Sequence, residues 1–423
     1  MQIQKLSSPT TTVALSVLPP LALYVHIPWC VRKCPYCDFN SHELKGPPHP
    51  GPLPLEGVLP RVPLEARSEK SLDQNLEEHY VQTLIADLDA ALPQIWGRPV
   101  RTIFFGGGTP SLLSAAAVEE LLSAIRARLP LVADAEITLE ANPGTFEAKK
   151  FAGFRAAGVN RLSVGIQSFD PAQLKALGRI HDDAQARRAL EIARNTFDNF
   201  NLDLMYGLPG QTIDQALADI ESGLEFSPAH VSAYHLTIEP NTLFHRHPPK
   251  LPDDEASADM QEAIEQRLAQ SGYGHYETSA FALPLRQARH NLNYWEFGDY
   301  LGIGAGAHSK ISFPDRVLRQ MRWKQPREYM EKTNAGTAIQ QENQVGVNEL
   351  PFEFMMNALR LVDGIELRTF EERTGVPLHS ITRELKEAES KGLIERDHLR
   401  LRPTLKGQRF LNDLLQMFLP TSP

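Results

Sequence analysis

Short apolar segments alternate with longer segments of helical spacing along much of this chain, and this alternation limits the folds that it can adopt. Each apolar segment has the length of a buried strand. The expected strands are 23–27, 102–105, 136–140, 161–165, 201–205 and 231–237. The expected helices are 76–92, 115–128, 146–157, 171–177 with 183–195, 213–226 and 255–270. Strand–helix units in series predict a parallel sheet with outer helices, here an α/β partial barrel of six units.

Polar and glycine-rich segments follow the expected strands one after another. In a parallel barrel the carboxyl ends of the strands meet at one mouth, where active sites lie. We therefore expect a single site built from the segments 30–37, 106–110, 140–143, 167–168, 203–209 and 237. This ordering indicates a site without reference to any family.

The cysteines of the chain all lie in the first of these segments, as Cys30, Cys34 and Cys37 in the spacing C-x3-C-x2-C. Iron–sulfur clusters are held by cysteine thiolates, normally four of them. With only three, a [4Fe–4S] cluster keeps one iron free for another ligand. The alternative is buried thiols or a disulfide with a spare thiol, which the spacing disfavours in a chain without a secretory context.

The cysteine motif and the strand before it, Tyr-x-His-Ile-Pro, resemble the radical S-adenosylmethionine (SAM) superfamily. From about residue 23 to the C-terminus, the chain resembles the branch that contains oxygen-independent coproporphyrinogen dehydrogenase and the HemW haem chaperones. In this superfamily SAM chelates the free iron, and one electron splits it into methionine and a 5′-deoxyadenosyl radical. The resemblance implies a [4Fe–4S] cluster and SAM as cofactors.

The resemblance also implies SAM contacts for a set of residues at the barrel mouth. These residues are Tyr24, Tyr36, Gly107, Gly108, Thr109, Glu140, Gln167, Arg179, Asp203 and Thr237. From the residues alone, the glycine-rich turn is as typical of a tight turn as of a site, and Glu140 is as typical of a helix cap. Plain packing explains Tyr36 equally well. Arg179 can pair with a carboxylate, and Asp203 can accept hydrogen bonds from ribose hydroxyls.

His290 begins the segment His-Asn-Leu-Asn-Tyr-Trp, which resembles the haem-binding signature of the HemW group. Imidazole is a common axial ligand of haem iron, and neighbouring aromatic rings can cover a porphyrin face. The resemblance implies that His290 binds haem, whereas a lone histidine is more often a surface or satisfied core residue. His308, in the glycine-rich segment 302–308, is a weaker candidate.

Phe39 stands two residues after Cys37, where coproporphyrinogen dehydrogenases carry a fourth cysteine. This departure and the haem signature favour a haem chaperone that passes haem to acceptor proteins, with respiratory haem proteins at the membrane as the expected acceptors. The alternative is an oxygen-independent coproporphyrinogen III dehydrogenase, in which the radical leads to oxidative decarboxylation of propionates.

Four regions are expected along the chain: a tail at 1–20, the barrel at 21–280, a connecting region with the haem motif at 281–350, and a winged-helix-like α+β domain at 351–423. Within the barrel, 46–71 is dense in proline and is typical of an inserted extended loop. The last domain raises a nucleic-acid-binding regulator as a further alternative. Glutamates stand among its basic residues, which disfavours a surface that faces phosphates.

The composition excludes further classes of protein. A net charge of −9 and a pI near 5.9 argue against a non-specific nucleic-acid binder. The chain has no run of 18 apolar residues, so we expect no membrane span. Residues 1–20 show no clear small-residue cleavage site, so we expect no signal peptide and a cytoplasmic protein with reduced thiols. The sequence leaves open whether the chain forms an oligomer.

Overall fold

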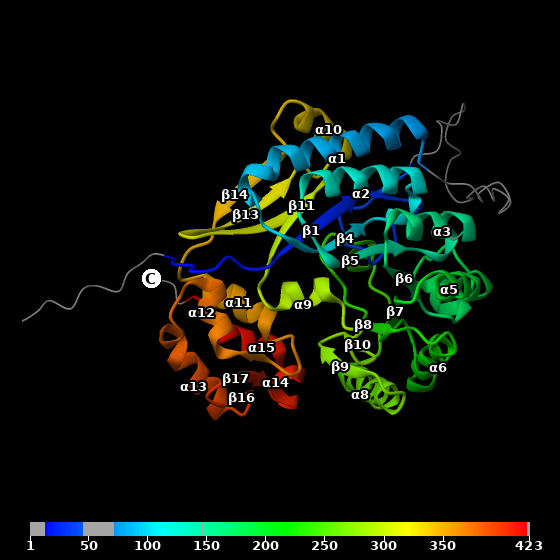
Figure 1. The fold of residues 1–423 in the computed structure, drawn as a ribbon. Helices are drawn as coiled ribbons and strands as arrows, with labels where there is room; N and C mark the ends of the chain where they lie inside the picture. The colour runs from blue at the N-terminus through cyan, green and yellow to red at the C-terminus, as the bar shows by residue number, and fades with distance from the viewer. Residues whose placement is uncertain (1–12, 45–71, 146, 421–423) are drawn as a thin grey trace, which may run out of the picture.

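The computed structural model describes residues 13–44, 72–145 and 147–420 (Figure 1). Residues 1–12 of the predicted tail and the predicted proline-rich insertion at 46–71 lie outside the described part. Within it, no helix is both long and apolar enough to cross a membrane.

Six parallel strands at the centre of the molecule match the six that the sequence predicts. They are β1 (Leu21–Ile27), β4 (Val100–Gly107), β5 (Leu131–Ala141), β6 (Arg161–Gln167), β7 (Phe200–Tyr206) and β8 (His230–His235). Almost every residue of β1, β6 and β7 is buried, as expected for strands that are covered on both faces. The predicted α/β partial barrel is confirmed.

Helices follow these strands, and most of them cover the outer side of the barrel (Figure 1). They are α1 (Gln74–Ile95), α2 (Ala115–Arg128), α3 (Ala148–Ala157), α4 (Pro171–Ala176), α5 (Asp183–Thr196), α6 (Ile213–Leu224), α7 (Leu243–Arg246) and α8 (Asp254–Gln270). In α1, Tyr80, Leu84 and Leu88 are fully buried at helical spacing, which forms the stripe that packs on the sheet. A capping box between Asp182 and Gln185 fixes the start of α5.

The connecting region adds strands that the sequence analysis did not identify. After α9 (Arg289–Trp295) come β11 (Asp299–Ile303), β12 (His308–Phe313), β13 (Arg316–Arg322), α10 (Pro326–Asn334) and β14 (Ile339–Gln344). β11 pairs in parallel with β1, and the following three strands continue antiparallel. On the opposite edge, β10 (Ala280–Ala282) and β9 (Gly274–Glu277) extend β8. The result is a 12-stranded sheet in the order β14-β13-β12-β11-β1-β4-β5-β6-β7-β8-β10-β9.

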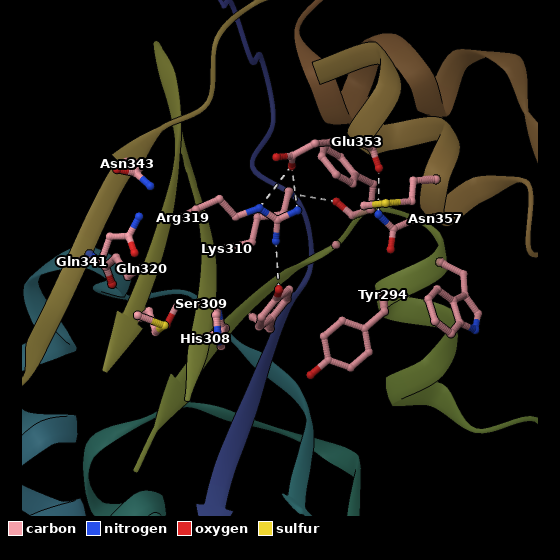
Figure 2. A pocket seen from close by; sticks show the side chains of 16 residues that line it. Tyr294, His308, Ser309, Lys310, Arg319, Gln320, Gln341, Asn343, Glu353 and Asn357 are labelled. Atoms are coloured by element: carbon pink, nitrogen blue, oxygen red, sulfur yellow. Dashed lines mark hydrogen bonds and ion pairs between the residues drawn. The ribbon is translucent and has the colours of Figure 1, made fainter. Parts of the chain in front are cut away.

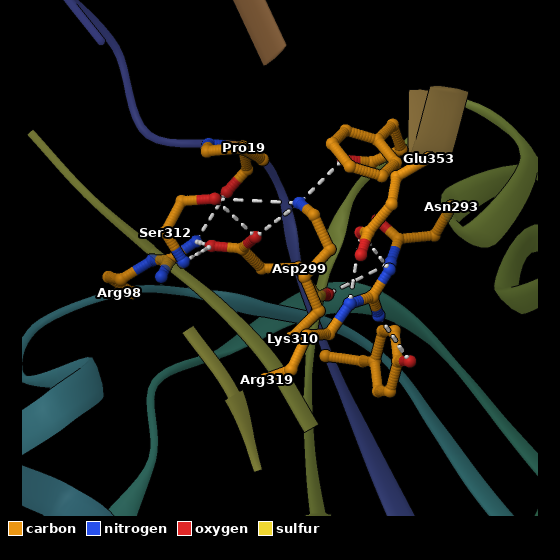
Figure 3. Close-up of polar contacts among 10 residues, drawn as sticks. Pro19, Arg98, Asn293, Asp299, Lys310, Ser312, Arg319 and Glu353 are labelled. Carbon is orange, nitrogen blue, oxygen red and sulfur yellow. Dashed lines mark hydrogen bonds and ion pairs between the residues drawn. The ribbon is translucent and has the colours of Figure 1, made fainter. Parts of the chain in front are cut away.

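A network of buried charges holds this extension against the barrel (Figure 3). The carboxylate of Asp299 accepts hydrogen bonds from Arg98 Nη2 at 2.8 Å, Lys310 Nζ at 2.9 Å and Ser312 Oγ at 2.8 Å. Lys310 also donates to the carbonyl of Phe297 at 3.0 Å. Burial acts to raise the pKa of Asp299, but Lys310 and Arg98 outweigh it and bring this pKa below its ordinary value.

The C-terminal domain has the predicted winged-helix-like arrangement of helices and a small sheet. Its elements are α11 (Leu350–Ala358), β15 (Ile365–Glu366), α12 (Leu367–Thr374), α13 (Thr382–Ser390), β16 (Ile394–Arg396), β17 (Arg400–Pro403), α14 (Leu405–Arg409) and α15 (Leu411–Gln416). The ring of Phe354 packs edge-on against Phe370 of this domain at 5.2 Å and against Phe297 at 5.6 Å. Val13 and Leu15 are buried in the same hydrophobic cluster, so this part of the tail packs against the C-terminal domain.

Candidate functional site

A cavity of about 510 Å³ opens at the carboxyl ends of the parallel strands. The predicted cluster residues and most of the predicted SAM residues line it: Cys30, Cys34, Tyr36, Cys37, Gly107, Gly108, Thr109, Glu140, Gln167, Arg179, Asp203 and Thr237. Tyr24 lies in a neighbouring cavity, which also borders Gly107 and Glu140. The structure therefore brings the residues of six successive segments to one mouth, as the strand pattern predicts.

The loop that carries the cysteines is closed by a two-stranded parallel ladder of β2 (Trp29–Cys30) and β3 (His42–Glu43). Asn40 holds the far side of this loop. Its Nδ2 donates to the carbonyl of Ala305 at 2.9 Å, and its own carbonyl lies 2.9 Å from His26 Nε2. The loop is thus tied to β1 and to the segment after β11.

Each cysteine sulfur lies near a hydrogen-bond donor. The pairs are Thr109 Oγ1 with Cys30 at 3.5 Å, Arg179 Nη1 with Cys34 at 3.7 Å, and Ser41 Oγ with Cys37 at 3.7 Å. Burial raises the pKa of the Cys30 thiol to about 11 and also raises the pKa of the Cys37 thiol. These thiols are therefore neutral unless a metal supplies the positive charge that holds them as thiolates.

The three cysteine thiols border one cavity, and thiolates are the ligands that hold iron–sulfur clusters. Across the residues that the structure describes, no three His, Cys, Asp or Glu side chains are close enough together to hold one metal ion. In a [4Fe–4S] cluster each thiolate binds a different iron, so the sulfurs stand apart. Donors beside the sulfurs also suit a cluster, because hydrogen bonds to sulfur stabilise its negative charge.

The glycine-rich turn after β4 packs so closely on the cysteine loop that it leaves no room for side chains. A Cβ at Gly108 would lie 2.5 Å from the carbonyl oxygen of Trp29. Gly107 has a φ of +113°, and a Cβ there would lie 2.6 Å from the ring of His26. The amide of Gly107 donates to Glu140 Oε2 at 3.2 Å. The segment is therefore a tight turn that also forms the wall of the cavity.

Two half-buried carboxyl groups, Glu140 and Asp203, face the cavity. Asp203 accepts hydrogen bonds from Ser163 Oγ at 2.9 Å and Asn201 Nδ2 at 2.7 Å. Burial, and then the charge of Asp203, raises the pKa of Glu140 to about 8, and burial also raises the pKa of Asp203. Two acids close together in the wall of one cavity favour a cationic ligand. SAM fits this requirement because it carries a sulfonium and an ammonium group.

Arg179 crosses the cavity floor and joins three of its walls. Its Nη2 donates to Asn142 Oδ1 and to the carbonyl of Gly165, both at 2.6 Å, while Nη1 lies beside Cys34. Its Nε is buried without a hydrogen-bond partner in the described structure. Gln167, at the end of β6, has a φ of +73°, which is strained for a residue other than glycine and turns the chain toward this floor.

Several residues that line the cavity were not among the predicted site residues: Asn142, Ser163, Tyr234 and His235. Asn142 belongs to the segment 140–143, which the strand pattern does place at the site, although it is not one of the residues that the resemblance assigns to SAM. Tyr234 and His235 end β8, whereas the predicted strand runs to 237 and so hides them inside it. Ser163 lies within β6 and reaches the cavity because it faces the barrel interior.

His290, the predicted haem ligand, lies inside the barrel with only 6% of its surface exposed. Its Nδ1 is 2.8 Å from Glu136 Oε1, and its ring stacks on Phe104 at 4.3 Å. Burial lowers the pKa of His290 even though Glu136 acts to raise it. The pair is therefore a neutral imidazole that donates its Nδ1 proton to a carboxylate. His290 does not line the barrel-mouth cavity or the two cavities that adjoin it.

Two further cavities, of about 640 and 570 Å³, continue from the barrel mouth toward the C-terminal domain. The first shares Asp38, Phe39, Gly107 and Glu140 with the barrel-mouth cavity, and it shares Tyr294, Tyr300 and His308 with the second. We call these two cavities the aromatic trough. Figure 2 shows the second of them, with His308 and Arg319 on the strands, Tyr294 on α9 and Glu353 above.

Comparison with known proteins agrees with this geometry. Residues 24–222 match the model of the radical SAM superfamily, and residues 347–410 match the HemN C-terminal domain. The fold and the site thus define a radical SAM protein. A solved structure with a similar fold is coproporphyrinogen III oxidase (HemN) from Escherichia coli, with a TM-score of 0.75, 24% identity, and coverage of 95% of this chain and 90% of that chain.

Sequence relatives identify the branch. The protein named "Heme chaperone HemW" from Escherichia coli (strain K12) is 48% identical, over 95% of this chain and 99% of the relative. The HemW proteins of Haemophilus influenzae and Bacillus subtilis are 44% and 32% identical, over 95% and 94% of this chain and 98% of each relative. The chain belongs to the HemW family.

Proposed function

We propose that this chain is a haem chaperone that holds haem and transfers it to acceptor haem proteins. Its relatives carry the name heme chaperone and match it over nearly their whole lengths, which supports this function. The observation that carries the proposal is the aromatic trough, which is continuous with the barrel mouth and is open to a planar ligand. Each of its two cavities has the volume expected of a small-molecule site.

The barrel mouth is proposed to hold the [4Fe–4S] cluster and SAM. Cys30, Cys34 and Cys37 would bind the cluster, and the donors beside their sulfurs would stabilise it. The predicted SAM residues would surround its charged groups, with Glu140 and Asp203 facing the cationic part. When bound, the cluster and SAM would supply one-electron chemistry at this mouth.

His290 remains the sequence-based candidate for the haem ligand. Metal-binding histidines commonly donate their second ring N–H to a carboxylate, and Glu136 accepts such a bond from His290. For iron to reach His290, however, the ring would have to leave its stacked position behind Phe104.

The coproporphyrinogen dehydrogenase reaction remains the alternative function. Phe39 occupies the position of the fourth cysteine of that enzyme, and 61% of its surface is exposed at the boundary between the barrel mouth and the aromatic trough. The likeness to HemN, at 24% identity, concerns the fold alone. Respiratory haem proteins remain the proposed acceptors, and the C-terminal domain is not proposed to bind nucleic acid.

An anaerobic haem titration of the protein with a reconstituted cluster tests the proposal. We expect saturable binding with a shifted haem absorbance band, followed by loss of that band when an apo-haem protein is added. Iron and sulfide analysis of the same sample should give the cluster content. A sample with an intact cluster that binds no haem and converts coproporphyrinogen III to a vinyl product would overturn the proposal in favour of the alternative.

A further inference from the structure

His308 is the imidazole that the aromatic trough presents to a ligand. It begins β12, its side chain is exposed, and it lines both cavities of the trough. Among the described residues, neither of its ring nitrogens has a hydrogen-bond partner. The rings of His26 and His290, by contrast, are buried and engaged with Tyr24 and Glu136. His308 is therefore free to bind a metal ion without first breaking a contact.

Aromatic rings from four elements and from the cysteine loop line the trough together with this imidazole. Tyr294 of α9 and Tyr300 of β11 meet edge-to-face at 4.7 Å beside it. Farther along the trough, Tyr24 and Phe104 stack at 6.0 Å, and Phe39 exposes its ring at the junction with the barrel mouth. Such rings offer apolar faces and edges to a flat conjugated ligand. These rings suit the face of a porphyrin, while polar side chains such as Gln320, Asn343 and Asn357 line the rest of the second cavity.

The cations of the trough are only partly neutralised. Arg319 is engaged by Glu353 at 2.7 Å and by the hydroxyl of Tyr300 at 2.8 Å. Lys33 donates to two backbone carbonyls and, like the exposed Lys324, pairs with no acid within the described residues. Asp38 and Glu140 are the acids on the same cavity wall, and the raised pKa of Glu140 leaves it largely uncharged at neutral pH. This excess of positive charge complements the carboxylates of haem.

The protonation of His308 also suits iron binding. Burial, and then the charges of Lys324 and Arg319, lowers the pKa of His308 below its ordinary value. The ring is therefore neutral near pH 7, which is the form that binds a metal ion.

We propose that haem binds in the aromatic trough with His308 as an axial ligand and with Lys33 and Lys324 beside its propionates. This inference rests on the proposed haem-chaperone function and assigns the iron to an exposed histidine instead of to buried His290. In this position one edge of haem would lie against Phe39 and Glu140, which also line the barrel-mouth cavity.

The test is an anaerobic titration of the full chain, with its cluster reconstituted, with ferric haem, followed by absorbance and by electron paramagnetic resonance of the haem iron. His308→Ala should weaken binding by about tenfold or more, equivalent to ~1.4 kcal/mol, and change the spin state of the iron. Added imidazole should restore the wild-type spectrum. His398→Ala removes an exposed histidine of the C-terminal domain and should bind haem as the wild type does.

A charge reversal tests the propionate contacts separately. Lys33→Glu with Lys324→Glu should weaken binding without changing the spin state, because the iron ligand stays in place. His290→Ala, checked for folding by circular dichroism, should retain the wild-type haem spectrum. His290→Gln serves as a second variant that keeps a hydrogen-bonding side chain beside Glu136.

The outcomes distinguish the haem-chaperone function from the assignment of His308 as the iron ligand. Wild-type protein that binds no haem would overturn the chaperone function and this inference together. Haem binding that is identical in wild type and His308→Ala would overturn only the inference. Loss of the ligand spectrum in folded His290→Ala or His290→Gln, with His308→Ala unaffected, would assign the iron to His290.

Discussion

Glu140 shows how one side chain can connect two neighbouring sites. Its carboxyl group accepts a hydrogen bond from the turn that wraps the cysteine loop, and it borders both the barrel-mouth cavity and the aromatic trough. Burial and nearby Asp203 keep its pKa near 8. A positive charge placed beside it would therefore drive a proton off the group.

This state of Glu140 predicts a pH dependence of SAM binding. Below pH 8 the carboxyl is mostly neutral in the empty site, so affinity for cationic SAM should rise as the pH approaches about 8 from below and then level off. Glu140→Gln should weaken SAM binding by about tenfold, or ~1.4 kcal/mol. In this variant the SAM affinity should no longer show the rise with pH that ionisation of Glu140 causes. Calorimetry on reconstituted protein across the pH range measures both effects.

Glu239→Gln is the matched control for that measurement, since Glu239 lines the same cavity but its carboxylate accepts an exposed hydrogen bond from Thr237. Ionisable groups of SAM itself affect the wild type, Glu140→Gln and Glu239→Gln equally. Their contribution therefore cancels when the three pH profiles of SAM affinity are compared. An unchanged pH profile in Glu140→Gln would show that this carboxyl does not face the ligand.

Sequence reasoning was most successful for residues in, or soon after, the C-terminal half of a parallel strand. Cys30, Glu140 and Asp203 all reach the predicted mouth, because a strand end fixes the position of a side chain in a parallel barrel. It was less informative for His290. A motif records residue types along the chain, whereas burial behind Phe104 depends on packing between elements far apart in sequence.

At the scale of elements, the parallel strands were predictable and the antiparallel extension was not. Beside the apolar Ile311 and Val317, strands β12 and β13 bury many polar or charged side chains: Ser309, Lys310, Ser312, Gln320 and Arg322. Alternation of apolar and polar residues, the usual signal of such strands, is therefore hidden. Several of these polar side chains form hydrogen bonds with one another, and Arg322 forms an ion pair with buried Asp87 at 3.2 Å.

The buried pair at the base of this extension predicts a large effect on stability. Asp299→Asn should lower the free energy of unfolding by about 3–5 kcal/mol, because it leaves Lys310 as a buried charge without its partner. Asp315→Asn breaks an exposed pair with Arg316 and should change stability by less than about 1 kcal/mol. Urea unfolding at neutral pH compares these variants with the wild type.

Urea unfolding of the wild type and Asp299→Asn at low pH tests whether the charge of Asp299 causes the difference in stability. The pKa of Asp299 in the folded state lies below its ordinary value, so its stabilising contribution is present above the unfolded pKa. It is lost as the pH falls through the folded pKa. The difference between wild type and Asp299→Asn should therefore shrink below about pH 4. A difference that is independent of pH would indicate that packing, not charge, is responsible.

On the scale of the whole molecule, the C-terminal domain is joined to the sheet by a shared hydrophobic core. Phe354 is fully buried between Phe297 of the connecting region and Phe370 of the domain. Phe354→Ala should therefore destabilise the protein by about 3–5 kcal/mol. Leu405→Ala, at a side chain that is 58% exposed, should change stability by only about 0.5 kcal/mol.

Denaturant unfolding followed by both fluorescence and circular dichroism measures this coupling. We expect one transition for the wild type, because the two parts share a core. A Phe354→Ala protein in which the barrel transition is unchanged and only a separate domain transition shifts would contradict a shared core.

The position of β1 has a consequence for how the chain is made. Although it is the first strand, it lies between β4 and β11, and its β11 side is filled only by Asp299–Ile303. On the ribosome, domains fold as their residues emerge, so β1 and the attached cysteine loop have an unpaired strand edge for most of translation. The loop becomes tied to Ala305 only after β11 has emerged. The proposed cluster, if assembled before that moment, would sit on an unfinished scaffold, so we expect its insertion late in the biogenesis of this protein.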